Sequence, residues 1–429
     1  MQPPQAAKRE LYQASPSVGS VTRRAFWRLR ASLWQSKFMA LTQSLVGELA
    51  QQAGFTLGGI AAIPDSATAE GKQERARFAA WVEAGSAGEM DYLKRANDHG
   101  ELLRASVHTA FPWAQSVIVC AANYSSHYPL STHPSAPDAA WIARYAWSGS
   151  GERSAPGEAQ RPSDYHKVLL KRLKAMESAL HERCGDFESR CYVDTGPLVE
   201  RVYARYAGLG WTGKNTCLLN QELGSWLFLG VILTSLQIAS QELAMPAEDR
   251  CGSCTRCIDA CPTQALTPYR MDASRCIAYL TIEKRGAIPP GDIGGDPREG
   301  IGRNVFGCDI CQDVCPWNKR AGARTVPAAA DPELAPREAL INPALDWLAS
   351  MSERDFGEWF FGSPVKRARF DGFRRNLAIA MGNSGLAHFI PTLHEWSNAP
   401  EDGLAQAAAW ALRRLENRAS ADAETRTAS

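Results

Sequence analysis

The sequence contains no run of about 18 consecutive apolar residues, the length that a helix needs to span a membrane. We therefore expect no membrane segment. A charge imbalance is also missing, because 47 basic and 46 acidic residues leave a formal net charge of +1. Such a chain has no general attraction for nucleic acid, so a nucleic-acid surface would have to be local. With 45% hydrophobic residues the composition is that of an ordinary globular protein, and 429 residues predict two or three domains.

A convincing export signal is absent too. Residues 22–28 (T-R-R-A-F-W-R) superficially resemble a twin-arginine signal, but no small-residue cleavage site follows them. Basic residues interrupt the segment that should be apolar: Arg28, Arg30 and Lys37. We expect residues 1–38 to be a disordered leader, or chain upstream of a true start at Met39 rather than Met1. An amphipathic helix is predicted from Leu41 to Gly54. The protein is therefore expected in the cytoplasm.

Eight of the twelve cysteines lie close together, between Cys251 and Pro316. The stretch begins C-G-S-C-T-R-C-I-D-A-C-P and, after a lone Cys276, closes with C-D-I-C-Q-D-V-C-P. This C-x2-C-x2-C-x3-C-P spacing is typical of thiolates that hold a [4Fe–4S] cube. Structural zinc usually takes paired C-x2-C knuckles, and disulfides need an oxidising compartment. The spacing therefore predicts two [4Fe–4S] clusters in a ferredoxin-like domain, residues 246–320.

The same spacing predicts which thiols share a cube. In two-cluster ferredoxins the fourth cysteine of such a run ligates the other cluster. By that rule the first cube takes Cys251, Cys254, Cys257 and Cys315, and the second takes Cys261, Cys276, Cys308 and Cys311.

Residues 39–245 predict an α/β domain with a central sheet. Three apolar runs read as strands: Ser116–Tyr124, Cys191–Val193 and Trp226–Thr234. A basic amphipathic helix is predicted over Val168–Cys184. The Gly/Ser/Pro-rich residues 148–163 predict a mobile surface loop.

Two polar stretches in this domain are candidates for chemistry. The first is Asp164-Tyr165-His166-Lys167. The second is D-T-G-P, which begins at Asp194 after a short strand and is followed by Glu200 and Arg201. A carboxylate at the end of a strand lies where α/β folds bind ligands. In a dry site its pKa would rise, and it could donate a proton near neutral pH. The alternative is an Asx turn in which Asp194 only caps its loop.

The C-terminal third predicts helices. Pro- and Ala-rich residues 321–345 are expected to be a linker, residues 346–418 a helical domain with HEAT-type hairpins, and residues 419–429 a disordered tail. Basic residues cluster at one edge of this domain: Lys366, Arg367, Arg369, Arg374 and Arg375. Such a cluster could contact phosphates, or it could be a solvated helix face.

From about Met39 to Arg418 the chain resembles the epoxyqueuosine reductases. The resemblance rests on Asp164-Tyr-His-Lys, on V-D-T-G-P around Asp194, on G-L-G-W-T-G-K-N from Gly208, and on the double cluster motif with R-C-I-A-Y-L-T-I-E from Arg275. It implies a cytosolic enzyme that reduces epoxyqueuosine to queuosine at the wobble position of tRNA. It also implies a nitroreductase-like α/β domain that holds cobalamin, two clusters that supply electrons, and a HEAT-like domain that contacts the anticodon stem-loop.

The resemblance further implies roles for particular residues. Cob(I)alamin would attack the epoxide, Asp194 would donate the proton, and Tyr165 and His166 would line the substrate pocket. The implied cobalamin contacts are Arg95, Ala143, Asp194, Leu218, Leu229, Ala278 and Asp309. An external electron donor is needed, and the sequence does not identify it. A monomer is expected. The long loop 148–163 and the leader depart from the family pattern.

Two other classes remain open at this point. A cobalamin-dependent reductive dehalogenase would share both cofactors, but it would ordinarily carry an export signal and would not need the basic helical end. A non-enzymatic iron–sulfur electron-transfer protein, or a tRNA-binding protein, would not need the α/β domain.

Overall fold

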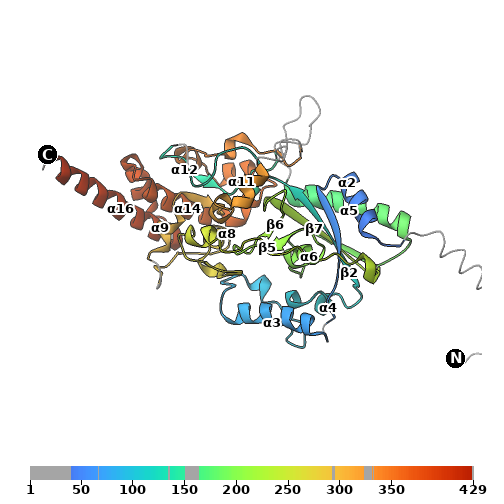
Figure 1. The fold of residues 1–429 in the computed structure, drawn as a ribbon. Coiled ribbons are helices and arrows are strands. Elements are labelled where there is room, and N and C mark those ends of the chain that lie inside the picture. The colour runs from blue at the N-terminus through green and yellow to red at the C-terminus, as the bar shows by residue number, and fades with distance from the viewer. Residues whose placement is uncertain are drawn as a thin grey trace, which may run out of the picture.

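The computed structural model describes residues 40–65, 67–133, 136–149, 164–291, 295–322, 331 and 333–427. The predicted leader and almost all of the predicted loop 148–163 lie outside these residues. A central sheet with two helices against it occupies one end of the molecule, and the C-terminal helices form the other end (Figure 1). None of the helices in the described ranges is long and apolar enough to cross a membrane.

The central sheet has four antiparallel strands in the order β1-β2-β7-β4. Their bounds are β1 Leu57–Ala62, β2 Ser116–Asn123, β4 Ser189–Tyr192 and β7 Leu227–Thr234. The three strands predicted from apolar runs are thus confirmed to within two residues at each end. Strand β1 was not predicted, because its sequence L-G-G-I-A-A contains two glycines, which strands disfavour. The fold requires one of them: a Cβ atom at Gly59 would lie 2.7 Å from the Ala207 carbonyl oxygen.

Both faces of the sheet are covered. Alternate residues of β2 point to opposite sides: Ile118 and Cys120 pack in the core cluster that contains the helices α2 (Gln43–Gln52) and α5 (Tyr165–Cys184). Val117 and Val119 pack on the other side, where α6 (Glu200–Tyr206) lies. A strand buried on both faces carries a continuous apolar run rather than an alternating one, which explains the pattern of β2.

Helix α5 starts at a capped residue. The Asp164 side chain accepts a hydrogen bond from the His166 backbone N–H at 3.0 Å, so Asp164 is the N-cap. Tyr165, His166 and Lys167 therefore fill the first turn, and Gly185 follows the last residue. This start lies three residues before the predicted one and fixes the direction of two candidate site residues.

The second part of the chain consists of short elements around the cysteine loops. They are α7 (Arg256–Asp259), β8 (Leu266–Thr267), β9 (Arg270–Met271), α8 (Ile277–Ile282), α9 (Pro297–Ile301), β10 (Asn304–Phe306), α10 (Ile310–Asp313) and α11 (Pro316–Gly322). Strand β10 pairs in parallel with β3 (Trp141–Ile142), which belongs to the α/β part of the chain. The predicted boundary near residue 246 is therefore crossed by a strand pair.

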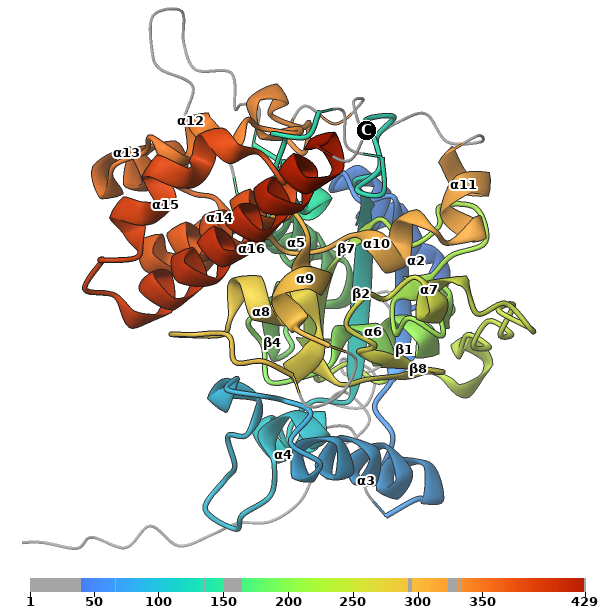
Figure 2. The ribbon, with the colours of Figure 1, turned by 90° about the vertical axis from the view of Figure 1, so that its left-hand side faces the viewer.

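Five helices form the C-terminal end: α12 (Leu345–Ala349), α13 (Glu353–Trp359), α14 (Arg369–Ser384), α15 (Ile390–Trp396) and α16 (Asp402–Thr427). Figure 2 shows α14 beside α16. Pro391 lies in the first turn of α15. Helix α16 continues past Arg418 into the segment that we expected to be disordered. Apolar residues of this end share one core cluster with the cysteine part and with β3.

One sequence prediction needs correction here. Arg375 is 1% exposed, and its guanidinium donates to the carbonyl oxygens of Leu280, Lys284 and Gly286, so it does not belong to a phosphate-binding cluster. The described part of the predicted linker contacts the α/β part. Arg172 of α5 forms ion pairs with Asp331 and Glu333 at 2.8 Å each, which fastens this segment to the α/β part.

The remaining α-helices and strands lie on the side of the sheet that α6 covers or, as α3 and α4 do, in the separate lobe at the bottom of Figure 2. They are α3 (Ala69–Glu83), α4 (Val107–Ala110), β5 (Trp211–Thr212) and β6 (Leu218–Leu219).

Candidate active site

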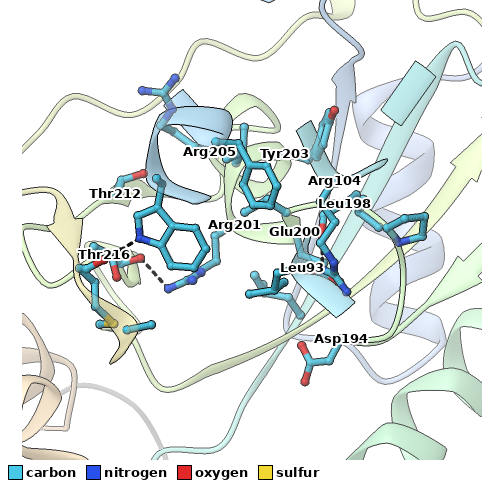
Figure 3. A pocket seen from close by; sticks show the side chains of 18 of the residues that line it. Leu93, Arg104, Asp194, Leu198, Glu200, Arg201, Tyr203, Arg205, Thr212 and Thr216 are labelled. Atoms are coloured by element: carbon cyan, nitrogen blue, oxygen red, sulfur yellow. Dashed lines mark hydrogen bonds between the residues drawn. The ribbon is translucent and has the colours of Figure 1, made fainter. Parts of the chain in front are cut away.

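The described residues enclose a large cavity of about 2010 Å³. Its walls come from every part of the chain: Trp81 from α3, Leu229 from β7, Ile282 from α8, and Arg367 from η8 (Pro364–Ala368). Figure 3 shows part of its lining. Ligand sites for drug-sized molecules measure about 300–1,000 Å³. This cavity is therefore large enough for more than one such group.

Asp194 lies on the cavity wall in an unusual backbone conformation. Its φ angle is 57°, in the left-handed region that residues other than glycine rarely adopt. The Thr195 N–H donates to the Val193 carbonyl at 2.7 Å, and a Cβ atom at Gly196 would lie 2.7 Å from the Tyr192 ring, so the turn is tightly constrained. Strained non-glycine residues of this kind concentrate at functional sites.

Side chains of α5 hold the Asp194 carboxylate. The Tyr165 hydroxyl donates a hydrogen bond to Asp194 Oδ2, and His166 Nε2 lies 3.5 Å from the same oxygen. His166 Nδ1 lies 2.7 Å from Asp164 Oδ1, so the N-cap aspartate orients the imidazole. Within the described ranges the carboxylate thus bonds to another element, which contradicts the alternative of a simple Asx turn. The structure brings Asp194, Tyr165 and His166 together.

Tyr165 is set up as a hydrogen-bond donor. Its ring stacks on Phe228 at 4.2 Å between centroids and on His166 at 4.0 Å. Burial, and after it the negative charge of Asp194, raises the pKa of Tyr165 well above its usual value. Because the phenol stays protonated, its hydrogen points at the Asp194 carboxylate.

A second carboxyl group in the cavity was not identified as a site residue from the sequence. Glu200, the first residue of α6, lines the same cavity as Asp194. Burial, and after it the charge of Asp194, raises the pKa of Glu200 to about 7. Its only signal in the sequence is its place six residues after Asp194, because burial of its carboxyl depends on the tertiary fold.

The predicted cobalamin contacts fall into two groups. Arg95 and Leu229 line the large cavity with Asp194. The others are not among its lining residues: Ala143, Leu218, Ala278 and Asp309. Asp309 is 2% exposed and accepts hydrogen bonds from the Trp141 indole at 3.0 Å and from the Arg144 backbone at 2.7 Å. Its position is explained by these buried contacts.

The thiols of the first predicted cube surround a smaller cavity of about 190 Å³. Cys251, Cys254, Cys257 and Cys315 all line it. Burial, and after it the charges of the other three thiols, raises the pKa of Cys257 to about 11. Four sulfurs around one cavity form a donor set that suits a four-iron cube.

The thiols of the second predicted cube also influence one another. Burial, with contributions from Cys276 and Cys261, raises the pKa of Cys308. The pKa of Cys311 is also raised, first by a hydrogen bond with Cys217, then by burial and by the charges of nearby thiols, Cys308 and Cys276 among them. In the described part of the chain no three His, Cys, Asp or Glu side chains are arranged to hold a single metal ion. A cube makes a different demand, because each thiolate binds a separate iron. The eight ligands remain a prediction that this grouping supports.

Trp211 connects the first thiol set with the large cavity. Its ring packs with Cys315 and Cys251 and also lines the cavity. Only the Trp211 side chain therefore separates these thiols from the cavity on whose wall Asp194 lies.

Two thiol sets beside a large cavity define the class of an iron–sulfur oxidoreductase. Residues 250–318 match the family model "4Fe-4S double cluster binding domain", and residues 104–195 match "Epoxyqueuosine reductase QueG, DUF1730". The chain belongs to the epoxyqueuosine reductase family. It is 39% identical to the epoxyqueuosine reductase of Synechocystis over 74% of this chain and 98% of that protein. For the Escherichia coli enzyme the identity is 35%, over 80% of this chain and 83% of the relative.

Solved structures agree with this membership. An epoxyqueuosine reductase in complex with an epoxyqueuosine-modified tRNA-Tyr stem loop matches with a TM-score of 0.69 and 28% identity, over 91% of this chain and 90% of that chain. A Bacillus subtilis epoxyqueuosine reductase, described with its catalytic aspartate loop swung out of the active site, matches with a TM-score of 0.69 and 27% identity, over 91% of both chains. The membership favours the prediction of a reductase over a dehalogenase or a non-enzymatic protein.

Proposed function

We propose that this protein reduces epoxyqueuosine to queuosine in tRNA. Its relatives carry the name of that activity, and a similar structure holds an epoxyqueuosine-modified stem loop. The observation that carries the proposal is the Asp194 carboxylate, held by Tyr165 and His166 on the wall of a cavity beside the thiol loops. We place the reaction in the cytoplasm, because that compartment keeps thiols reduced and the two thiol sets need reduced cysteines to hold clusters.

The residues of both cavities fit the cofactors of this proposal. The two thiol sets would hold [4Fe–4S] clusters, which pass electrons from an external donor. The large cavity has about twice the volume of the largest ordinary ligand sites, so it can take a corrin and a modified base together. Arg95 and Leu229 would contact the cobalamin there. When bound, cobalamin supplies a low-valent cobalt nucleophile for the two-electron opening of the epoxide.

Asp194 supplies a proton in this proposal. Breaking a C–O bond of the epoxide places negative charge on the oxygen, and a protonated carboxyl within reach neutralises that charge as it develops. Tyr165 and His166 fix the orientation of the carboxyl group from a rigid helix. The left-handed turn at Asp194 keeps the side chain in the cavity rather than against its own loop.

A surface next to the cavity suits a single-stranded nucleic acid. Trp359 is 43% exposed and Phe361 is 53% exposed. Lys167 and Lys366 lie 5.8 Å and 5.9 Å from the Phe361 ring centre, and neither pairs with a carboxylate in the described ranges. Exposed aromatic rings flanked by cations stack bases and neutralise phosphates. Because Lys167 follows His166 directly, this aromatic surface lies at the cavity and would hold the anticodon loop. The HEAT-like character of the C-terminal helices belongs to the same proposal.

An anaerobic assay with a stem loop that carries epoxyqueuosine tests the function. We expect the loaded, reduced enzyme to convert the nucleoside to queuosine, as measured by mass spectrometry. Asp194→Asn should retain its cofactor absorption spectrum and lose at least about 10²-fold in kcat, since general acid catalysis contributes that much or more. Asp186→Asn is the control. It changes an exposed aspartate just before β4 and should keep the wild-type rate. Unchanged nucleoside with a fully loaded wild-type enzyme would refute the proposal.

A further inference from the structure

The proposed reaction needs a second proton. Reduction of an epoxide to an alkene breaks both C–O bonds, and the oxygen leaves as water. That change consumes two electrons, which the external donor supplies through the clusters, and two protons. Asp194 can hold only one of these protons at a time. Its side chain is 51% exposed in the empty cavity, and a bound corrin and modified base would separate it from solvent.

We propose that Glu200 is the second proton store of this site and returns a proton to Asp194 after Asp194 has protonated the epoxide oxygen. This inference rests on the proposed function and adds a residue to it. Figure 3 shows Asp194, Glu200 and Arg104 on the same side of the cavity.

The surroundings of Glu200 favour its neutral form. Its Oε1 atom is buried and has no hydrogen-bond partner in the described ranges. A buried carboxylate oxygen without a partner is costly, whereas a protonated carboxyl avoids most of that cost. Glu200 lines the same cavity as Asp194, and the charge of Asp194 acts on its carboxyl group, so the two groups are close enough to influence one another.

The charged groups around Glu200 do not cancel this preference. Arg104 of η2 (Leu103–Ala105) donates to the Leu198 carbonyl at 2.9 Å, and Arg201 donates to the Thr216 carbonyl at 2.8 Å. Both cations lower the pKa of Glu200, but less than burial and Asp194 raise it.

The strands under α6 add no further charge. Strands β1, β5, β6 and β7 carry no titratable side chain, and Cys120 of β2 packs on the opposite face of the sheet. The result is a carboxyl group with a pKa of about 7. It therefore holds a proton for much of the time at neutral pH.

Two proton transfers to the oxygen accompany the breaking of the two C–O bonds. The first C–O bond breaks and the Asp194 proton moves to the oxygen, which becomes a hydroxyl group. Glu200 then returns a proton to Asp194, directly or through a water molecule. The second C–O bond breaks while Asp194 gives this proton to the hydroxyl, which leaves as water. Glu200 is reprotonated from solvent between turnovers.

The sign of the pH dependence follows from the raised pKa. While Asp194 is ionised, as it is after the first proton transfer, Glu200 carries its proton below about pH 7 and loses it above that value. The rate of a single turnover should therefore fall as pH rises, by about tenfold for each pH unit above the pKa.

Single-turnover kinetics of the reduced holoenzyme on the modified stem loop test the inference. Glu200→Gln should lower the rate constant about 10²-fold and remove its dependence on pH near 7, with stem-loop affinity unchanged. Glu200→Asp keeps an acid in place and should restore part of the rate together with the pH dependence. Glu182→Gln, an exposed change on α5, is the control.

A second measurement does not depend on turnover. Difference infrared spectroscopy of the wild-type protein should show a protonated carboxyl band that titrates near pH 7 and is missing in Glu200→Gln. A Glu200→Gln enzyme with the wild-type rate and pH profile, or a wild-type protein without that band, would overturn the role of Glu200. A wild-type enzyme that leaves the nucleoside unchanged would instead refute the proposed function.

Discussion

At the scale of single residues, the site depends on side chains whose surroundings differ from what their type suggests. Asp194 occupies a left-handed conformation that usually belongs to glycine. Phe361 is a large apolar ring that is half exposed, with two lysines beside it. Each arrangement is unfavourable for an isolated protein and becomes favourable when a ligand is present, which is the usual character of a binding site.

Replacement of Phe361 tests the aromatic surface. Phe361→Ala should raise KM for the stem loop about tenfold, the lower end of the stacking energies of about 1–3 kcal/mol per base, and should leave kcat nearly unchanged. Phe361→Tyr should retain the wild-type KM, because it keeps the aromatic face. Leu243→Ala, which removes an exposed apolar side chain elsewhere, is the control. Equal KM values for the alanine variant and the wild type would remove Phe361 from the RNA surface.

The sequence predicts residue roles where spacing alone carries the chemistry. The cysteine grouping is an example, because the order of ligands along the chain follows from the shape of the cube. It could not predict that Asp194 bonds to Tyr165, since that contact joins α5 to the turn after β4. It also placed Arg375 on the surface, because a run of basic residues does not reveal which one points into a core.

At the scale of elements, glycines decide which helices and strands pack closely. Helix α14 contains Gly372, around which a Cβ atom would meet nothing within 4 Å, and Gly382, where it would lie 2.7 Å from the Ala411 Cβ of α16. Apolar runs predicted β2 and β7 well, since burial on both faces gives a continuous signal. Strand β1 was not predicted, because its close approach to Ala207 requires a glycine, which strands disfavour. The start of α16 lies in the predicted helical domain, and only its extension past Arg418 was missed.

These two glycines of α14 should respond oppositely to alanine. Gly382→Ala should lower the free energy of unfolding by about 1–3 kcal/mol, because the added methyl forces α14 away from α16. Gly372→Ala should raise it by about 0.5–1 kcal/mol, since alanine has the better helix propensity and has room. Guanidinium unfolding of both variants measures the difference. Shifts of the same sign would contradict the packing described for α14 and α16.

At the scale of the whole molecule, the parts predicted as separate domains share a core. Phe306 of the cysteine part and Leu377 of the C-terminal end belong to one buried cluster, which also contains Trp141. Sequence composition marks linkers by their polarity and proline content, but it does not reveal contacts that cross them. The order of the parts was therefore predictable, and their mutual dependence was not.

Removal of the C-terminal helices should consequently damage the cluster sites. A chain that ends at residue 331 exposes apolar side chains around Ile277 and Phe306, so we expect aggregation and loss of bound iron. A chain that ends at Arg418 keeps the buried residues of α16 through Leu415 and should retain its iron. Iron content and sedimentation of the two truncated proteins, reconstituted in parallel, measure this. Full iron in the shorter chain would show that the cysteine part folds alone.

The parallel pairing of β3 with β10 also affects how the chain folds during its synthesis on the ribosome. Trp141 leaves the exit tunnel long before Asn304 is made. At about 5–20 residues per second, translation leaves β3 unpaired for on the order of ten to thirty seconds. Five of the eight predicted ligands, from Cys251 to Cys276, emerge in the same interval, before β3 has its partner strand.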